Sequence, residues 1–213
     1  MKIAKFEFSL FGINTYVVYD EATRECAIID PGMINAVEEN AMLRFISGNH
    51  LEVKHIINTH LHVDHAVGNK FATEQFRLPV SAHIDDVFLG ERLQAQAQAF
   101  GIAERIDDVS VGVFLEDGDI VKIGEGALKV LHVPGHSPGS IALYDEKDGF
   151  VIAGDALFAG SIGRTDLPGG DLDQLLGAIR SKLMTLPDNT IVYSGHGPET
   201  TIGKEKKSNP FLR

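Results

Sequence analysis

The chain has 213 residues, 44% of them hydrophobic, and a formal net charge of −11 at pH 7. This length and apolar content suit one large domain with a sizeable core, so two full domains are not expected. The negative charge excludes a nucleic-acid binder, which would need clustered Lys and Arg to displace phosphate counterions.

The first half of the chain alternates predicted strands and helices. Residues 1–12 alternate apolar and polar side chains like a strand, and residues 14–20 and 25–32 are typical of paired strands. Apolar spacing of three to four predicts helices, and short apolar runs predict further strands. The helices are expected over residues 34–50, 65–76 and 84–100, and the strands over 53–60 and 78–83.

The second half changes to strand, turn and strand. Residues 119–136 and 139–155 are apolar runs interrupted by Gly and Asp-Gly, which is typical of hairpins. A helix over residues 171–186 and a strand over 190–197 follow. No linker or low-complexity tract divides the halves. The sequence therefore predicts two α/β halves in a single domain, with sheets inside and helices outside.

Composition also bears on the compartment. The N-terminus has no apolar core of signal-peptide length, and no apolar run of about 18 residues occurs anywhere. The only cysteine, Cys26, lies in the apolar run "CAIID" and is expected to be a buried strand thiol. A cytoplasmic protein without a membrane partner is expected.

The stretch "NTHLHVDHAVGN" at residues 58–69 concentrates metal-ligand side chains. If residues 60–64 leave the preceding strand in an extended form, His60, His62 and Asp64 lie on one side. The turn into the next helix can then bring His65 to the same cavity. Histidines interleaved with an aspartate after an apolar strand predict a bound cation.

Three further candidates lie where apolar runs end in glycine-rich turns. They are His136 in "VLHVPGHSPGS", Asp155 in "FVIAGDALF" and His196 in "IVYSGHGPE". Strand ends deliver side chains to a common edge, and glycines allow the backbone to pass close to a crowded centre. Together with the first cluster they provide seven ligands, enough for two ions that share a water.

On these motifs the sequence resembles the metallo-β-lactamase superfamily, with "THLHVDH" as its THxHxDH signature. The resemblance covers residues 1–213 and implies an α/β fold, the αβ/βα four-layer sandwich, with a dinuclear site along one edge of the sheets. It implies that His60, His62 and His136 bind one metal and that Asp64, His65 and His196 bind the other. Asp155 would bridge the two. His50, His55, His83 and His132 match no ligand position.

The branch is indicated by Asp155 and the residues after it. True β-lactamases of the family usually carry Cys or Ser at that position, so antibiotic hydrolysis is not expected. The segments "GDALFAGSIGRTDLPGG" and "SGHGPETTIGKEKKSNPFL" look like those of short glyoxalase II-like hydrolases. The implied substrate is an acylated glutathione such as S-lactoylglutathione, or a related thioester. Full-length glyoxalase II continues into a helical glutathione-binding domain, which this chain is expected to lack.

The expected chemistry follows from the ligands. Two divalent ions, most simply Zn²⁺, with Fe²⁺ or Mn²⁺ also suited to the ligands, lower the pKa of a shared water toward ~7. Asp64 and Asp155 are expected to hold the resulting metal-bridged hydroxide, which attacks the thioester carbonyl. Arg164 matches a glyoxalase II position that contacts glutathione and is a candidate substrate-binding residue. Its alternative role is an ion pair with Asp166 or Asp171 that stiffens the loop.

Two other functions stay open at this point. A mononuclear iron persulfide dioxygenase shares this fold and a similar "GRTD" segment, and its iron ligands would correspond to His60, His136 and Asp155. Consumption of oxygen during the reaction would distinguish such a dioxygenase from a hydrolase. The third possibility is a metal-binding module without catalytic activity, which measured metal with no turnover would support.

Overall fold

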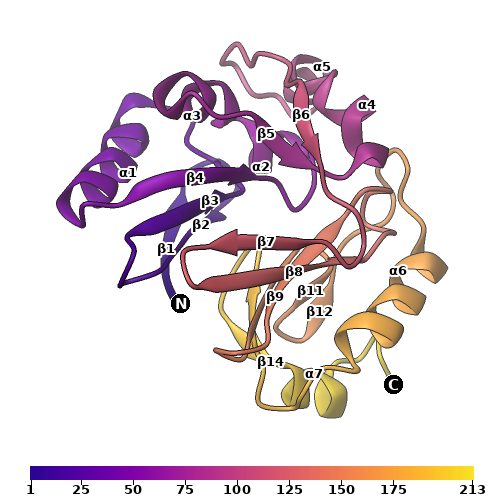
Figure 1. Ribbon diagram of the computed structural model, residues 1–213. Coiled ribbons are helices and arrows are strands. Elements are labelled where there is room, and N and C mark those ends of the chain that lie inside the picture. The colour runs from indigo at the N-terminus through magenta and orange to yellow at the C-terminus, as the bar shows by residue number, and fades with distance from the viewer.

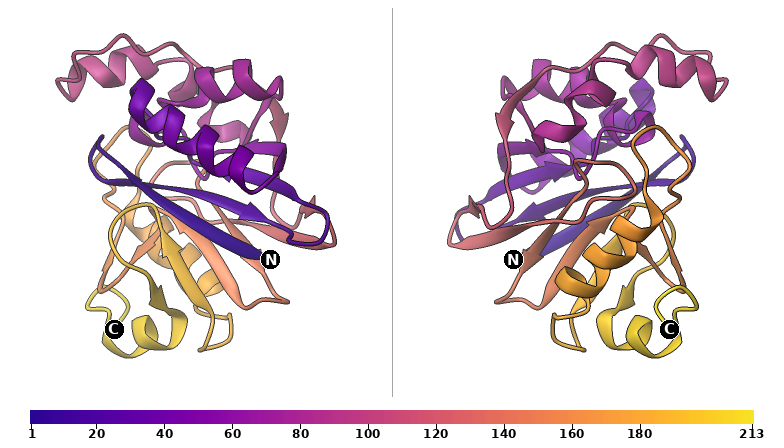
Figure 2. Two further views of the ribbon diagram at one scale, coloured as in Figure 1. Left: turned by 90° about the vertical axis from the view of Figure 1, so that its left-hand side faces the viewer. Right: turned by 90° about the vertical axis from the view of Figure 1, so that its right-hand side faces the viewer.

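The computed structural model describes residues 1–213 and contains two six-stranded sheets. The sheets lie face to face, and helices cover the outer face of each, as the two side views show (Figures 1 and 2). The molecule therefore has four layers, in the order helices, sheet, sheet, helices. This confirms the predicted sandwich with the sheets inside.

The N-terminal sheet has the strand order β1-β2-β3-β4-β5-β6. The first three strands pair antiparallel, and β3 to β6 pair in parallel. Parallel neighbours need crossover connections, which the helices of this half provide. The strands are Lys2–Phe8, Ile13–Tyr19, Glu25–Ile29, Glu52–Ile57, Val80–Ala82 and Val111–Phe114. The helices are α1 (Ala36–Gly48), α2 (Val63–Ala66), α3 (Asn69–Phe76), the 3-10 turn η1 (Ile84–Asp86), α4 (Val87–Gly90) and α5 (Leu93–Ala99).

The C-terminal sheet has the order β14-β13-β10-β9-β8-β7 and is antiparallel except for the pair β10 and β13. Its strands are β7 (Ile120–Ile123), β8 (Gly126–His132), β9 (Ile141–Asp145), β10 (Phe150–Gly154), β13 (Ile191–Ser194) and β14 (Thr200–Thr201). Outside it lie α6 (Leu172–Ala178), the π-helical turn η2 (Ile179–Leu183), α7 (Ile202–Ser208) and a small hairpin of β11 (Leu157–Phe158) and β12 (Ser161–Ile162).

Apolar side chains from both sheets fill the space between them. Alternate residues of β2 and β3 meet alternate residues of β8, β9 and β10, as period-two geometry requires. This inner core includes Tyr16, Val18, Ala27, Ile29, Val130, Leu143 and Ile152, all buried. Each Val, Leu or Ile side chain of this core contributes roughly 1.5–3 kcal/mol of transfer free energy when fully buried. The two sheets are therefore held in fixed positions, which fixes the edge where their strand ends meet.

The predicted helix over residues 84–100 is wrong as a single element, because the chain forms η1, α4 and α5 instead. The break falls between Gly90 and Leu93, where Arg92 has a non-helical φ of −136°. Gly90 allows close packing there, because a Cβ at this position would lie 3.1 Å from the Val109 carbonyl oxygen. The Val109 N–H also donates to the Gly90 carbonyl. The helix predicted over residues 65–76 is also divided, because α2 ends at Ala66 and α3 begins at Asn69. The other predicted strands and helices lie within a few residues of their expected bounds.

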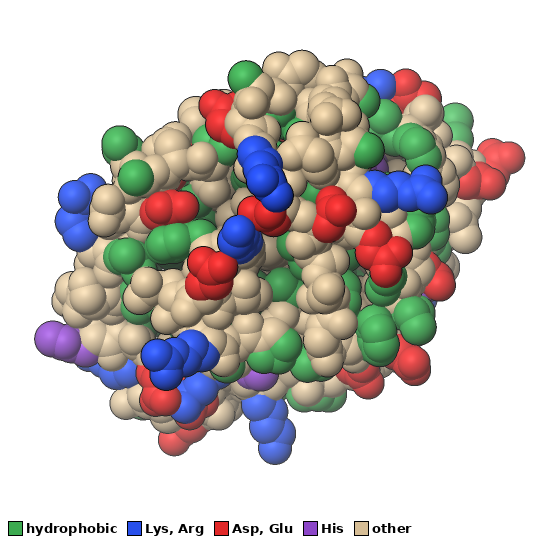
Figure 3. Space-filling view, turned by 90° about the horizontal axis from the view of Figure 1, so that it is seen from above, with side chains coloured by type: hydrophobic (Ala, Val, Ile, Leu, Met, Phe, Trp, Pro, Cys, Tyr) green, Lys and Arg blue, Asp and Glu red, His purple; other side chains and the backbone are tan.

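The surface over the N-terminal helices carries acidic and basic side chains mixed together, with scattered apolar ones (Figure 3). Such a surface is typical of a solvated outer layer. No helix combines the length and apolarity needed to cross a bilayer. Cys26 is buried within β3, and burial raises the pKa of its thiol to about 12. This fits the expected strand thiol.

Candidate metal centre

The histidine-rich segment begins directly after β4 and runs into α2. Leu61 and Val63 are buried in the core beneath α5, which turns the neighbouring side chains the other way. The extended geometry expected for residues 60–64 holds only as far as His62, which is the N-cap of α2. Asp64 instead lies in the first turn of that helix and reaches the cavity from there. The side chains still converge, although by a different local route.

Three imidazoles meet at one point. Nδ1 of His62 lies 2.9 Å from Nε2 of His136, and that nitrogen lies 3.2 Å from Nε2 of His60. All three side chains are buried. His136 follows β8 after a turn at Gly135, so the N-terminal and C-terminal halves each contribute to this cluster.

A second cluster lies beside the first. Nε2 of His196 is 3.0 Å from Oδ2 of Asp64, and Nε2 of His65 is 3.8 Å from the same oxygen. His196 follows β13, and its loop is held against the N-terminal sheet because Tyr16 and Asn14 both donate to the carbonyl of Ser194. These contacts fix the position of the loop at the sheet edge.

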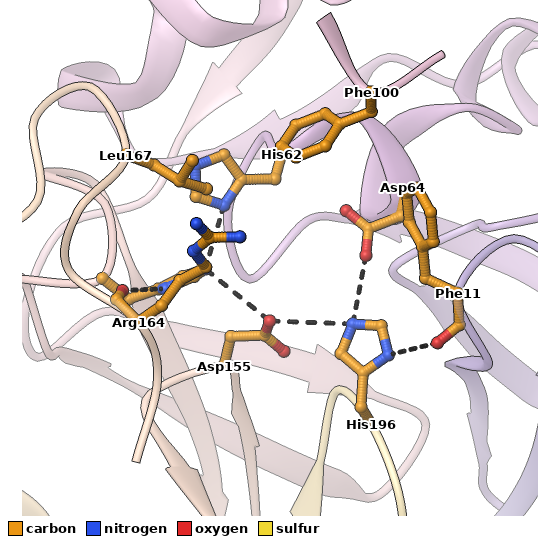
Figure 4. Close-up of a pocket in the computed structure, with 9 residues that line it drawn as sticks. Phe11, His62, Asp64, Phe100, Asp155, Arg164, Leu167 and His196 are labelled. Carbon is orange, nitrogen blue, oxygen red and sulfur yellow. Dashed lines mark hydrogen bonds and ion pairs between the residues drawn. The ribbon is translucent and has the colours of Figure 1, made fainter. Parts of the chain in front are cut away.

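Asp155, directly after β10, lies between the two clusters (Figure 4). Its Oδ2 is 3.6 Å from Nε2 of His136 and 3.6 Å from Nε2 of His196, while its Oδ1 is 3.3 Å from Nε2 of His65. Gly195 makes this approach possible, because a Cβ there would overlap the Asp155 carboxylate and lie 2.6 Å from Cε1 of His65.

The outer nitrogens of four histidines face acceptors, which directs the inner nitrogens toward the centre. Nδ1 of His136 donates to the Arg164 carbonyl at 2.7 Å, and Nδ1 of His196 faces the Phe11 carbonyl at 3.2 Å. Nδ1 of His65 lies 3.0 Å from the Asp30 carboxylate. Nδ1 of His60 lies 3.2 Å from Oγ1 of Thr59, whose own proton goes to Asp30. Partners of this kind fix the tautomer of metal-binding histidines.

The electrostatic environment keeps most of the nitrogen and oxygen atoms that face the centre unprotonated, so that they can bind a cation. Burial, with repulsion from neighbouring histidines, lowers the pKa of His60 far below its ordinary value and that of His62 to about 3, so both rings are neutral at pH 7. Burial alone would raise the pKa of Asp155, but the adjacent imidazoles of His65 and His136 outweigh it and hold the pKa well below its usual range. Burial by itself would lower the pKa of His65, but the carboxylates of Asp155 and Asp64 outweigh this effect and raise it.

The donor set fits divalent metal ions. Nε2 of His65 and Oδ1 of Asp155 are buried and lie 3.3 Å apart without forming a hydrogen bond, an arrangement that is costly unless something else satisfies them. Four groups in the chain have ligand atoms close enough for one ion, and three of them lie in this centre: His60, His62 and His136; His60, His65 and Asp155; and Asp64, His65 and His196. The fourth, His83, Asp85 and His132, lies apart from it. Imidazole and carboxylate ligands of this kind suit zinc, iron and manganese.

A cavity of about 330 Å³ opens over these ligands and is lined by His62, Asp64, His136, Asp155 and His196 together with Phe11, Phe100, Arg164 and Leu167. The Arg164 guanidinium makes two 2.7 Å hydrogen bonds to the Asp166 carboxylate. That pair lowers the pKa of Asp166 to about 2. Arg164 therefore lines the cavity and also forms the ion pair considered as its alternative role.

The other four histidines lie outside the two clusters. His83 and His132 stack face to face with ring centroids 4.0 Å apart, and Nε2 of His132 donates to the Pro138 carbonyl. Nε2 of His55 lies 2.9 Å from the Lys122 carbonyl, and His50 occupies the turn before β4 at a φ of 54°. Sequence reasoning did not find Asp30, Asp86 or Phe11, because nothing local marks a single Asp or Phe as a neighbour of a distant histidine.

The fold and the clustered imidazoles and carboxylates together define an αβ/βα sandwich protein whose side-chain clusters fit divalent metal ions. The chain belongs to the metallo-beta-lactamase superfamily, whose family pattern matches residues 9–196. Hydroxyacylglutathione hydrolase GloC of Haemophilus influenzae is 37% identical, and the similarity covers the whole of this chain and 98% of the relative. Probable metallo-hydrolase YqgX of Bacillus subtilis is 39% identical, and the similarity covers 88% of this chain and 87% of the relative.

Solved structures are similar over almost the whole chain. One described as BLEG-1 B3 metallo-beta-lactamase has a TM-score of 0.89 and 35% identity, covering 99% of each chain. TTHA1623 in a di-iron-bound form has a TM-score of 0.85 and 37% identity, covering 98% of this chain and 100% of that one. ETHE1 from Myxococcus xanthus has a TM-score of 0.81 and 29% identity, covering 99% and 84%. The protein thus has the metallo-beta-lactamase fold.

Proposed function

We propose that this protein is a metal-dependent hydrolase that cleaves a thioester such as S-lactoylglutathione. His60, His62 and His136 would hold one divalent ion, Asp64, His65 and His196 a second, and Asp155 would contact both. The observation that carries the proposal is the position of Asp155, whose Oδ2 is 3.6 Å from a nitrogen of each cluster.

When bound, the ions would supply a Lewis acid for the scissile carbonyl and lower the pKa of a water toward ~7. The chain's own residues prepare that water. The carboxylates of Asp64 and Asp155 accept its hydrogen bonds, and the lowered pKa of each keeps them ionised, since nearby histidines outweigh the opposing effect of burial. The Asp30 and Thr59 contacts keep His65 and His60 oriented.

A nucleophile from the protein is not needed for this reaction. Cys26 is buried in β3, and no serine lines the cavity. The attacking oxygen would come from water, so the products are a carboxylic acid and a free thiol in equal amounts.

The thioester assignment is supported by a relative and by one side chain. The Haemophilus influenzae relative is named as a hydroxyacylglutathione hydrolase. Arg164 lines the cavity and presents a guanidinium, whose forked donors match a carboxylate such as those of glutathione. A substrate carboxylate would replace Asp166 as its partner.

The test is release of thiol from S-lactoylglutathione by metal-loaded protein, with His62→Ala as an inactive control. We expect turnover that disappears when the metal is removed and returns when it is restored. Metal-loaded protein that cleaves no thioester would overturn the proposal. The likeness to BLEG-1 makes a β-lactam the second substrate to assay, and a much faster rate on the β-lactam would replace the thioester assignment.

A further inference from the structure

A second cavity of about 260 Å³ adjoins the metal cavity and shares His62, Phe100 and Leu167 with it. The remaining wall is almost entirely apolar and comes from two elements, the α4–α5 region and the loop before α6. Its apolar members are Phe88, Leu89, Ala95, Ala99 and Pro168, and its two polar members are Arg92 and Gln96. We call this cavity the apolar groove. Its shared residues place one end of it beside the metal ligands.

The Gln96 side-chain amide in the groove is already satisfied within the protein. Gln96 donates to the carbonyls of Leu89 at 2.9 Å and Leu61 at 3.3 Å, and its side-chain oxygen accepts from the N–H of Val63 at 3.1 Å. These bonds tie α5 to the metal-binding segment on both sides of His62. The groove therefore has a fixed position relative to the metal ligands and offers few polar partners to an occupant.

The charge of the groove excludes a cationic occupant. Its only charged side chain is Arg92, which is exposed and forms no salt bridge, and no acidic residue lines it. The arginine stem can cover apolar surface while its head stays in water. A neutral alkyl chain fits this environment.

Two phenylalanines lie where the two cavities adjoin: Phe100 lines both cavities, and Phe11 lines the metal cavity. Phe11 and Phe100 are 54% and 40% exposed, and their rings meet edge to face with centroids 6.0 Å apart. Phe11 has a φ of 57°, an unfavourable backbone region for a bulky residue. Strain at an exposed aromatic beside an active site is typical of a residue placed for a ligand.

We infer that the apolar groove binds an apolar arm of the substrate, attached at the scissile thioester. The inference rests on the proposed thioester hydrolysis. The arm is either the acyl chain or an alkyl group on the thiol, and both present the same chemistry to the wall.

The first experiment varies the arm with metal-loaded protein. One series holds glutathione constant and lengthens the acyl group from acetyl to decanoyl. The other holds acetyl constant and lengthens the alkyl thiol from ethyl to decyl. We expect kcat/KM to rise roughly threefold to fourfold per methylene in one of the series until the groove is full. The rising series identifies the arm, and two flat series overturn the inference.

The second experiment fills the groove. Ala99→Phe and Ala95→Phe place a large ring in it, whereas Gln98→Phe adds the same ring to an exposed position of α5 outside the groove. The measured quantity is kcat/KM for the substrate with an octyl arm divided by kcat/KM for the substrate with an ethyl arm, in the series that rises for the parent protein. We expect each groove variant to lower this ratio at least tenfold. Gln98→Phe should leave that ratio unchanged. Equal losses on both arm lengths in both groove variants would contradict the inference.

A binding measurement separates this inference from the proposed function. S-octylglutathione and S-methylglutathione are thioethers that cannot be hydrolysed, and their affinities can be compared by calorimetry on the metal-loaded protein. We expect the octyl compound to bind at least tenfold more tightly, and Ala99→Phe to abolish the difference. That result without any thioester turnover would reject only the proposed reaction. Turnover of thioesters with equal affinities would reject only the groove as the arm's site.

Discussion

His62 and His136 face each other across the two halves of the chain, with Nδ1 of the first 2.9 Å from Nε2 of the second although 74 residues separate them. Nδ1 of His136 donates to the Arg164 carbonyl, so its Nε2 carries a lone pair. The low pKa of His62, caused by burial and by His136 itself, keeps that ring neutral. A cation between the two nitrogens satisfies both, and this is the physical basis of the metal assignment.

The first prediction concerns metal stoichiometry. Protein loaded with zinc or iron should hold close to two ions per chain, and Asp155→Ala should lose binding at both positions because its oxygens approach both clusters. His62→Ala and His196→Ala should each lose one ion, which provides the matched comparison. Elemental analysis of dialysed protein measures this. An Asp155→Ala protein that keeps both ions would exclude Asp155 from the bridging position.

The second prediction concerns Asp86, a buried carboxylate that connects the segment around His60 and His62 with the loop that follows His136. It accepts hydrogen bonds from the N–H groups of Leu61 and Gly139 and from the hydroxyl of Ser137. Asp86→Ala leaves these donors without a partner and should lower the free energy of unfolding by about 3 kcal/mol or more. Metal affinity should fall as well. Chemical denaturation measures the first effect and competition with a chelator the second.

Glu91→Ala is the control for Asp86, because Glu91 is exposed and makes no side-chain hydrogen bond. It should change the free energy of unfolding by less than about 0.5 kcal/mol. Similar stabilities of the Asp86 and Glu91 variants would show that the carboxylate does not hold the loops together.

The third prediction concerns pH and His83. Burial, with the stacked ring of His132, lowers the pKa of His83 below 6.5. The His83 ring therefore binds a proton more readily in the unfolded chain than in the folded one. Its contribution to the free energy of unfolding is fully present above about pH 6.5 and is lost as the pH falls below that value. His83→Asn removes the titration but keeps a side-chain acceptor for the Asp85 N–H.

The parent protein should consequently lose more stability than His83→Asn between pH 7.5 and pH 5. Thermal unfolding of both metal-loaded proteins at several pH values measures the difference. If the melting temperatures of the two proteins fall equally between pH 7.5 and pH 5, protonation of His83 does not destabilise the folded state.

The fourth prediction concerns Arg164. If its guanidinium binds a carboxylate of the substrate in ground and transition states alike, Arg164→Ala should raise KM for an S-acylglutathione roughly tenfold and leave kcat and metal content unchanged. A small uncharged thioester should be unaffected. Asp166→Asn should have the opposite effect and lower KM, because it removes the competing partner.

The loop-stiffening role of Arg164 gives a different result. The Arg164 and Asp166 side chains are 55% and 68% exposed, so solvent screens their ion pair and it contributes little to stability. A fall in melting temperature with equal losses of activity on both substrates would remove Arg164 from the substrate site.

Much of the fold could be predicted because the long strands and α1 have strong periodicity. The strands after Ile120 and the helix at Ala36–Gly48 lie close to their expected bounds. The short elements β6, β14 and α7 were not predicted, since two to seven residues carry too little pattern and are defined by their neighbours. The helix over residues 84–100 fails because tertiary packing at Gly90 overrides helical spacing.

The candidate ligands could be predicted because ligand residues end predicted strands, and strand ends meet at a sheet edge. The partners that orient them could not. Asp30 lies 35 residues before His65, and Phe11 contacts His196 through a backbone carbonyl, which no side-chain pattern reveals. The apolar groove likewise arises from α4, α5 and the Leu167 loop, which only the folded chain brings together.

The most direct test of the account is thioester hydrolysis by metal-loaded protein in the absence of oxygen. We predict that S-lactoylglutathione is cleaved at the same rate with and without oxygen, that acid and free thiol appear in equal amounts, and that the rate rises with metal content until two ions per chain are bound. Full activity at one ion per chain, or a persulfide-dependent consumption of oxygen much faster than any thioester cleavage, would contradict the account.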